Sequence, residues 1–349
     1  MTVLIPAHAN VVFKIQSESS LSKEAGASFA VAARRWSNIL LDPITVSLQI
    51  GSHEAPASFL AFTELSLVSV NYSEYRSAFA NDQTSVADEL TYSLIPTGDF
   101  VPLLINRTSD SPHGPGSEEP YLDFNQSTNN RLLSMATANA RALGLLPAND
   151  GSIDAFISFN RDALYDYDPN DGIDADRLDF VGIAMHEIGH ALGFHSGMET
   201  LDRNSPPFGG PFPEDAFTFI SPLDLLRHSD LSREYGKDVV DWTADYREKY
   251  FTLDGDETRV PFSTGVFFGD GFHSSHWKFG MEIGGMDPTV WIGESVKISD
   301  YDLIAMDVIG YDLTPVPETA GTAAAGALLL GVFTVIQISR RRTKVVKGI

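Results

Sequence analysis

Three consecutive segments near the start of the chain carry the apolar patterns of a strand, a helix and a strand. Asn10–Ile15 is a short apolar run typical of a strand, and alternate residues from Ile44 to Ile50 are apolar. Between them, Lys23–Leu41 has an apolar face at helical spacing, and Pro43 ends that helix. This order predicts a βαβ crossover and a sheet with parallel pairs.

Later segments add a mixture of both element types. The patterns predict a weak strand at Phe100–Ile105, a helix at Thr128–Leu143 that ends at Gly144, and a strand at Asp154–Asn160. Together with the first segments they indicate an α+β fold with a mixed, twisted sheet.

A mid-chain segment carries histidines beside its apolar stripe. Apolar residues recur at helical spacing through Asp179–Phe194, which predicts a helix that ends at Gly193. His186 and His190 are four residues apart and therefore project from the same side of that helix. Two imidazoles placed in this way can share one metal ion.

Glu187 completes the pattern His-Glu-x-x-His, which is typical of zinc metalloproteases. It lies about 100° round the helix from His186, so it can contact the attacking water without being a ligand. The other interpretation is a core helix with two hydrogen-bonded histidines. Gly189 favours the metal site, because glycine inside a helix costs about 1 kcal/mol relative to alanine and is easier to explain where another segment passes close.

Composition excludes several other classes. The 349 residues are 43% hydrophobic, enough for one large or two ordinary folded domains. The net charge is -23, and residues 1–339 hold 19 basic against 47 acidic side chains, so nucleic acid is not an expected partner. Cysteine is absent, which leaves histidine and carboxylates as the available metal ligands.

Both ends of the chain resemble export signals. Residues 1–9 are interpreted as the remnant of a signal peptide, since Ala7-His8-Ala9 is similar to a cleavage site. Residues 320–338 are uncharged and mostly apolar and would form about 28 Å of helix, which predicts a transmembrane helix at 320–339 followed by a basic cytoplasmic tail at 340–349. With the linker 314–319, this end resembles the PEP-CTERM sorting signal of Gram-negative bacteria, although Thr319 replaces its second proline.

That resemblance implies export to the cell envelope or cell surface and recognition by an exosortase. The protein would be anchored in the membrane at its C-terminus or released after processing. A plain single-span anchor is the alternative.

An acidic loop precedes the metal helix. Asp166–Asp176 alternates oxygen-bearing side chains around Gly172, which is compatible with Ca²⁺ as a second cofactor. The glycine is one place late for an EF-hand loop, and no glutamate closes it. A solvated acidic loop is therefore the preferred interpretation.

A catalytic zinc ion needs a third protein ligand. Ser196 occupies the position, ten residues after His186, where one extended zinc motif has its third histidine. His195, one residue earlier, and the carboxylates of Glu199 and Asp202 are candidates, as is the distant His276. The remaining histidines are interpreted as surface or loop residues: His8, His53, His113, His228 and His273.

The order of several motifs resembles the leishmanolysin-like branch of the metzincin proteases. His-Glu-x-x-His-x-x-Gly-Phe is followed by an insertion at 197–275, Ser-His-Trp around His276, a methionine turn at Met286, and a helix capped by Ser299 and Asp302. The resemblance covers about residues 150–313 and implies a two-lobed metalloprotease domain, placed at 10–313. By position it makes His276 the third ligand and Met286 the residue beneath the metal. By analogy with zinc peptidases of this kind, the strand Asp154–Asn160 would lie along a cleft and pair with substrate backbone.

The expected function is that of an exported zinc endopeptidase acting on protein or peptide substrates. Glu187 would be the general base that takes a proton from the attacking water. The tyrosine that assists some metzincins is replaced by Pro288, so the donor to the oxyanion stays open. The alternative from another class is a surface adhesion or matrix protein with a structural or degenerate metal site.

Overall fold

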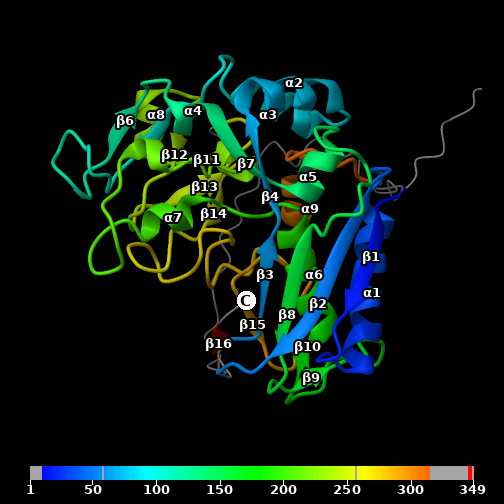
Figure 1. The fold of residues 1–349 in the computed structure, drawn as a ribbon. Helices are drawn as coiled ribbons and strands as arrows, with labels where there is room; N and C mark the ends of the chain where they lie inside the picture. The colour runs from blue at the N-terminus through cyan, green and yellow to red at the C-terminus, as the bar shows by residue number, and fades with distance from the viewer. Residues whose placement is uncertain (1–9, 57–58, 256–257, 315–344, 348–349) are drawn as a thin grey trace, which may run out of the picture.

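The computed structural model describes residues 10–56, 59–255, 258–314 and 345–347 (Figure 1). Its main sheet has the strand order β1-β2-β8-β3, formed by β1 (Val12–Ser17), β2 (Thr45–His53), β8 (Ala155–Asn160) and β3 (Ala61–Leu65). β1, β2 and β8 run parallel, whereas β3 is antiparallel to β8. The mixed sheet and the parallel β1–β2 pair agree with the sequence prediction.

Two helices cover one face of this sheet. α1 (Lys23–Ile39) joins β1 to β2, and α6 (Phe180–Leu192) follows β8. Phe159 of β8 contacts both helices, since its ring centroid lies 6.0 Å from that of Phe29 in α1 and 4.7 Å from that of Phe180 in α6. The Trp36 indole of α1 donates a hydrogen bond to the Met185 carbonyl at 2.9 Å, so the two helices are also joined directly.

β8 cannot accept a substrate strand. It was expected to lie along the cleft, but both of its edges are already paired, with β2 and with β3. In the described part of the chain the outer position on this side of the sheet belongs to β3.

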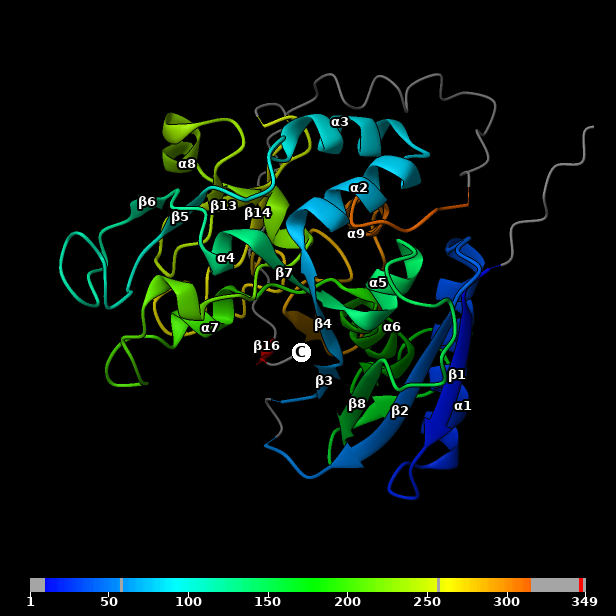
Figure 2. The same cartoon turned by 45° about the horizontal axis from the view of Figure 1, so that its top comes forward.

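β3 continues through Ser66 into β4 (Leu67–Asn71), which leaves the main sheet and pairs with β7 (Leu132–Ala136). The prediction of one helix over Thr128–Leu143 is wrong, because β7 lies in the middle of that stretch. This stretch instead forms α4 (Thr128–Arg131), β7 and α5 (Thr137–Ala142). Pairing with β4 outweighs the local helical pattern, which is a weak preference wherever a partner strand is available. α2 (Tyr72–Asp82) and α3 (Val86–Leu94) lie at the same end of the molecule (Figure 2).

The insertion 197–275 builds most of a second lobe, seen on the left of Figure 1. One of its sheets is antiparallel and has the order β11-β13-β14: β11 (Arg227–His228), β13 (Lys249–Phe251) and β14 (Val260–Phe262). The other has the order β12-β5-β6: β12 (Val240–Asp241), β5 (Leu103–Ile105) and β6 (Tyr121–Asp123). α7 (Met198–Asp202), η1 (Glu214–Ala216), η2 (Leu223–Leu226) and α8 (Asp230–Tyr235) complete it.

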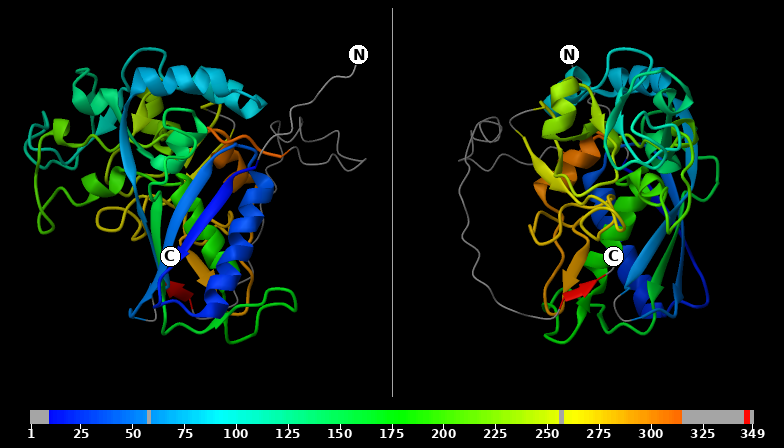
Figure 3. Two further views of the ribbon diagram at one scale, coloured as in Figure 1. Left: turned by 45° about the vertical axis from the view of Figure 1, so that its right-hand side comes forward. Right: turned by 90° about the vertical axis from the view of Figure 1, so that its left-hand side faces the viewer.

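The chain returns from this lobe to α6 through Trp277. The Trp277 ring lies 5.0 Å from Phe194 and 5.0 Å from Phe262 of β14, measured between ring centroids. α9 (Asp300–Asp307) then packs beside the first lobe, seen in Figure 3 in orange. Its predicted cap is confirmed, because the Ser299 hydroxyl accepts a hydrogen bond from the Asp302 amide.

Two further pairs of short strands lie outside the sheets described above. β9 (Tyr165–Asp166) pairs with β10 (Leu178–Asp179) at the two ends of the acidic loop, and β15 (Thr289–Trp291) pairs with β16 (Val345–Lys347). Within the described ranges, no helix is both long and apolar enough to cross a membrane. The predicted signal remnant at 1–9 and the predicted transmembrane helix at 320–339 lie outside those ranges.

Candidate metal centre

α6 has a capping residue at each end, and the sequence pattern predicted Gly193 as one of them. Its N-cap Asp179 accepts a hydrogen bond from the Gly182 amide at 2.8 Å. At the other end Gly193 adopts the left-handed conformation with φ 118°, which residues with a side chain rarely adopt. Apart from His190, which is partly exposed, every residue of the helix is buried. The helix is therefore a fixed support for the histidines that it carries.

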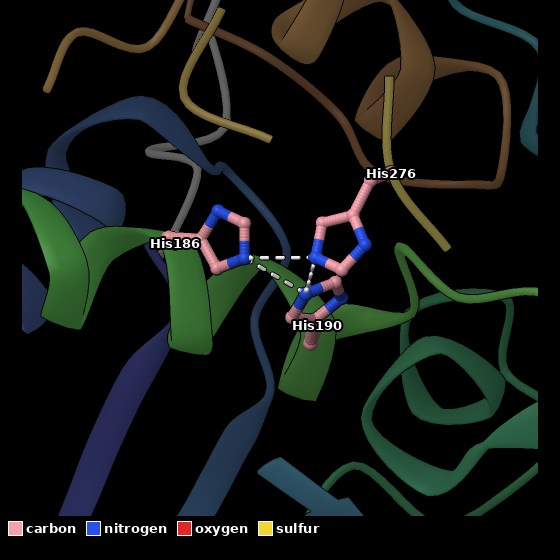
Figure 4. Close-up of side chains that lie close together, drawn as sticks. All are labelled: His186, His190 and His276. Carbon is pink, nitrogen blue, oxygen red and sulfur yellow. Dashed lines mark hydrogen bonds between the residues drawn. The ribbon is translucent and has the colours of Figure 1, made fainter. Parts of the chain in front are cut away.

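Three imidazole rings converge beside this helix (Figure 4). The Nε2 atom of His190 lies 3.0 Å from that of His186 and 3.2 Å from that of His276, and the third distance is 3.3 Å. His186 is fully buried, and only 4% of His276 is exposed. The prediction that His276 joins the two helix histidines is met: these three residues form a group that could bind a metal ion.

The opposite nitrogen of each ring faces a backbone carbonyl. The Nδ1 atoms lie 2.6 Å from the Gly285 oxygen for His186, 2.6 Å from the Phe194 oxygen for His190, and 3.1 Å from the His273 oxygen for His276. A carbonyl only accepts, so each Nδ1 carries the hydrogen and each Nε2 presents a lone pair. The three Nε2 lone pairs then face one another, and a metal ion between them could bind all three.

Burial keeps these rings neutral. It lowers the pKa of His190 to about 4 and, with His190 close by, holds the pKa of His186 and of His276 well below the usual range of histidine. Neutral imidazole is the form that ligates metal, so no proton has to leave at neutral pH before an ion binds.

Met286 packs closely against Gly189, as expected for a glycine inside a helix. A Cβ atom at this position would lie 2.6 Å from the sulfur of Met286. Met286 is fully buried, so its side chain packs against α6 at Gly189, the residue before His190. The packing role that the resemblance implied for Met286 fits this placement.

Asp302 connects the supporting segments. Its carboxylate accepts hydrogen bonds from the Trp277 indole at 2.7 Å, the Gly285 amide at 2.7 Å and the Met286 amide at 3.2 Å. Gly285 in turn supplies the carbonyl that orients His186. This carboxylate, recognised in the sequence only as a helix cap, thus links α9 to the segments on both sides of the metal centre.

Glu187 faces the edge strand β3. Its Oε2 atom accepts a hydrogen bond from the Thr63 hydroxyl at 2.5 Å, while its buried Oε1 atom has no hydrogen-bond partner among the described residues. Burial raises the pKa of Glu187 to about 8, and the Thr63 hydrogen bond opposes that rise. A cation at the three histidines would favour the charged carboxylate. No local sequence pattern identifies Thr63.

The turn that carries His276 is fastened to α7 by Glu199. The Glu199 carboxylate accepts a hydrogen bond from the Ser274 hydroxyl at 2.8 Å and from the Ser274 amide, and it pairs with the His273 ring at 3.3 Å. This pairing raises the pKa of His273. His273 lies in a loop and is exposed, as the sequence interpretation expected, and its ring centroid is 6.5 Å from that of His276.

The other candidate ligands are engaged elsewhere. The His195 ring faces its own loop, with Nδ1 3.2 Å from the Gly193 oxygen, and Asp202 accepts hydrogen bonds from the amides of Phe267 and Phe268. Neither they nor Glu199 belong to the three-histidine group. His228, expected at the surface, is fully buried in β11.

The acidic loop does not form a second group. Both oxygens of the Asp166 carboxylate accept hydrogen bonds from backbone amides, one from Asp168 at 2.9 Å and one from Asp174 at 2.9 Å. Among the residues that the structure describes, only the three histidines bring metal-ligating side-chain atoms together in this way. The loop thus resembles the solvated acidic loop that the sequence favoured over a calcium site.

Comparison with protein-family models, with curated proteins and with solved structures found no match. The site has therefore to be judged by its own geometry. In a tetrahedral site with Zn–N bonds of about 2.05 Å, ligand nitrogens lie roughly 3.3–3.4 Å apart. The three Nε2 separations of 3.0–3.3 Å are close to this spacing, so the residues present fit a zinc ion.

Proposed function

We propose that this chain is a zinc-dependent endopeptidase in which His186, His190 and His276 hold the metal and Glu187 is the general base. The observation that carries the proposal is the convergence of three histidine Nε2 atoms on one point from segments 86 residues apart. Zinc accepts this ligand set, whereas calcium and magnesium prefer oxygen.

The number of ligands supports a catalytic rather than a structural site. Structural zinc sites are closed by four protein ligands, while catalytic sites have three and leave one position open. The group contains three such side chains within the described residues, and the partly exposed His190 marks a side accessible to solvent. This arrangement also weighs against the adhesion protein with a structural site.

Zinc bound here would polarise the scissile carbonyl and lower the pKa of water. The residues of the chain supply proton transfer. Glu187 takes a proton from the attacking water and delivers it to the leaving amine, a role for a carboxylate oxygen that no other hydrogen bond occupies. Oε1 of Glu187, which has no hydrogen-bond partner in the described part of the chain, is that oxygen.

The outer strand β3 offers a place for the substrate backbone. Within the described residues β3 pairs only with β8, so its other edge has amide and carbonyl groups available for an extended peptide. Thr63 of this strand touches Glu187, which places the edge beside the general base. An extended peptide substrate is therefore proposed.

The decisive experiment combines metal analysis with a peptidase assay. Purified protein should bind one zinc ion and digest casein, and a chelator should abolish digestion until zinc is restored. Glu187→Gln should still bind zinc but lose roughly 10²–10⁴-fold in kcat. Zinc binding without hydrolysis in the unsubstituted protein would instead favour the structural site of an adhesion or matrix protein.

Export, membrane attachment and recognition by an exosortase rest on the sequence of residues outside the described ranges. They stay predictions, as do the domain boundaries assigned there. Detection of the protein in the cell envelope, and its loss from that fraction after deletion of 314–349, would test them.

A further inference from the structure

The Thr63 side chain donates a hydrogen bond to the carboxylate of Glu187, the proposed general base. Its hydroxyl oxygen lies 2.5 Å from Oε2 of Glu187 and 3.1 Å from the backbone oxygen of the same residue. The hydroxyl has one hydrogen to donate, and the shorter distance assigns it to the carboxylate. A hydrogen bond to a charged group is among the stronger ones in proteins.

The position of Thr63 in β3 makes this contact possible. Thr63 lies opposite Ile157 in the register of β3 with β8, at the middle of the strand. Ile157, like Phe159 two residues later, points to the face of the sheet that α1 and α6 cover, so the Thr63 side chain points to α6. A rigid strand, rather than a loop, therefore holds the hydroxyl against Glu187.

The two oxygens of the Glu187 carboxylate are consequently not equivalent. Oε2 is held by Thr63, and Oε1 is buried without a hydrogen-bond partner among the described residues. We infer that Thr63 is a positioning residue, which fixes the Glu187 carboxylate through Oε2 and leaves Oε1 to exchange the proton. This inference rests on the proposed function.

The proton path then involves one oxygen throughout. As the water oxygen bonds to the scissile carbon, one water proton moves to Oε1. The same proton passes from Oε1 to the leaving nitrogen as the C–N bond breaks, and the carboxylate is restored. The Thr63 hydroxyl keeps its own hydrogen, so its contribution is to fix the direction in which Oε1 points.

Two substitutions separate the hydroxyl from the shape of the side chain. Thr63→Val keeps the branched shape that suits a strand but removes the hydroxyl, while Thr63→Ser keeps the hydroxyl. In casein-derived peptide assays we expect Thr63→Val to lose roughly 10- to 100-fold in kcat with KM changed less than about twofold. Thr63→Ser should retain most of the kcat. Both variants should keep their zinc content and melting temperature.

A second measurement does not depend on activity. In crystal structures of the metal-free variants, the Glu187 carboxylate should leave its position in Thr63→Val and keep it in Thr63→Ser. Thr63→Ala serves as the second hydroxyl-free variant if Thr63→Val folds poorly.

The outcomes distinguish this inference from the proposed function. Unchanged kcat in Thr63→Val, an equal loss in Thr63→Ser, or a carboxylate that stays in place without the hydroxyl would each overturn the positioning role. If instead the unsubstituted protein hydrolyses no peptide, the proposed function fails. The crystallographic comparison then still decides whether Thr63 holds Glu187.

Discussion

Gly189 shows how a single residue reflects the packing beneath the metal centre. In an exposed helix, replacing glycine with alanine stabilises by up to about 1 kcal/mol. Here the added methyl group would lie 2.6 Å from the Met286 sulfur and 3.6 Å from the Met306 methyl group, both in the core. The helix propensity of alanine would therefore stabilise the protein, whereas the contact with Met286 would destabilise it.

We expect the contact to dominate. Gly189→Ala should lower the free energy of unfolding by roughly 1–3 kcal/mol, as measured by urea denaturation, because overpacking displaces Met286. Adding Met286→Ala should recover part of that loss, so that the two substitutions are not additive in a double-mutant cycle. A more stable Gly189→Ala variant would mean that Met286 moves aside at no cost.

Residue types identified the ligands on α6 from sequence, but they did not identify Thr63. His186, Glu187 and His190 form a local pattern whose geometry follows from helix periodicity. Thr63 is 124 residues away from Glu187, and a threonine in a strand carries no signal of its own. Only the pairing of β3 with β8 brings it to Glu187, the proposed general base.

At the scale of elements, α9 supports the metal centre from a distance. Asp302 accepts hydrogen bonds from Trp277, Gly285 and Met286, and Gly285 orients His186. Groups that orient metal ligands commonly change metal affinity 10- to 100-fold when they are removed. Asp302 acts one step further out, through the backbone of Gly285.

Asp302→Asn should therefore weaken zinc binding by roughly tenfold, because an amide nitrogen cannot accept the hydrogen bonds that one carboxylate oxygen now accepts. Competition with a chromophoric chelator measures this affinity. Asp300→Asn is the matched control, since Asp300 begins the same helix but is exposed. Equal zinc affinity in both variants would contradict the supporting role of Asp302.

Three capped helices with an apolar face were predicted, whereas α2 and α3, which also begin at capping residues, and β7, which is defined by its pairing, were not. The sequence placed α1, α6 and α9, since each has an apolar face and a capping residue at its start. It merged α4, β7 and α5 into one helix, because β7 is a strand only through its partner β4. It also offered the wrong strand as the edge, since β8 is paired on both sides.

At the scale of the whole molecule, a cluster of carboxylates joins distant parts of the chain. Burial raises the pKa of Asp42 to about 8 and that of Asp82 and of Asp307 to about 7, and neighbouring carboxylates, including Asp312, add to these shifts. The Asp42 carboxylate accepts the Asp312 amide at 3.2 Å, so the end of α1 meets the segment after α9.

This cluster should make stability depend on pH. The unfolded carboxyls have a pKa near ~3.9, so the folded state binds more protons at intermediate pH. The contribution of these protonated carboxyls to the free energy of unfolding is complete below about pH 4. It is lost as the pH rises towards their pKa values of about 7–8 in the folded protein. Asp42→Asn should raise the melting temperature by roughly 2–5 °C more at pH 8 than at pH 5.5.

Calorimetry at the two pH values, with the unsubstituted protein beside the variant, measures this difference. Asp300→Asn is again the control, because Asp300 is exposed at the start of α9. An equal effect of Asp42→Asn at both pH values would show that Asp42 titrates normally in the folded protein.

The sequence by itself determined the local features of this protein. These are the helix with two histidines on one side, its caps, the acidic surface, and the choice of histidine over thiolate as ligand, since all follow from residue types and helical spacing. Tertiary structure decided which distant groups complete the site. His276 and Thr63 reach residues of α6 from two separate segments, and Asp302 of α9 holds Gly285, whose carbonyl faces His186. Such contacts join residues that are far apart in the sequence, and the spacing of residues along the chain does not encode them.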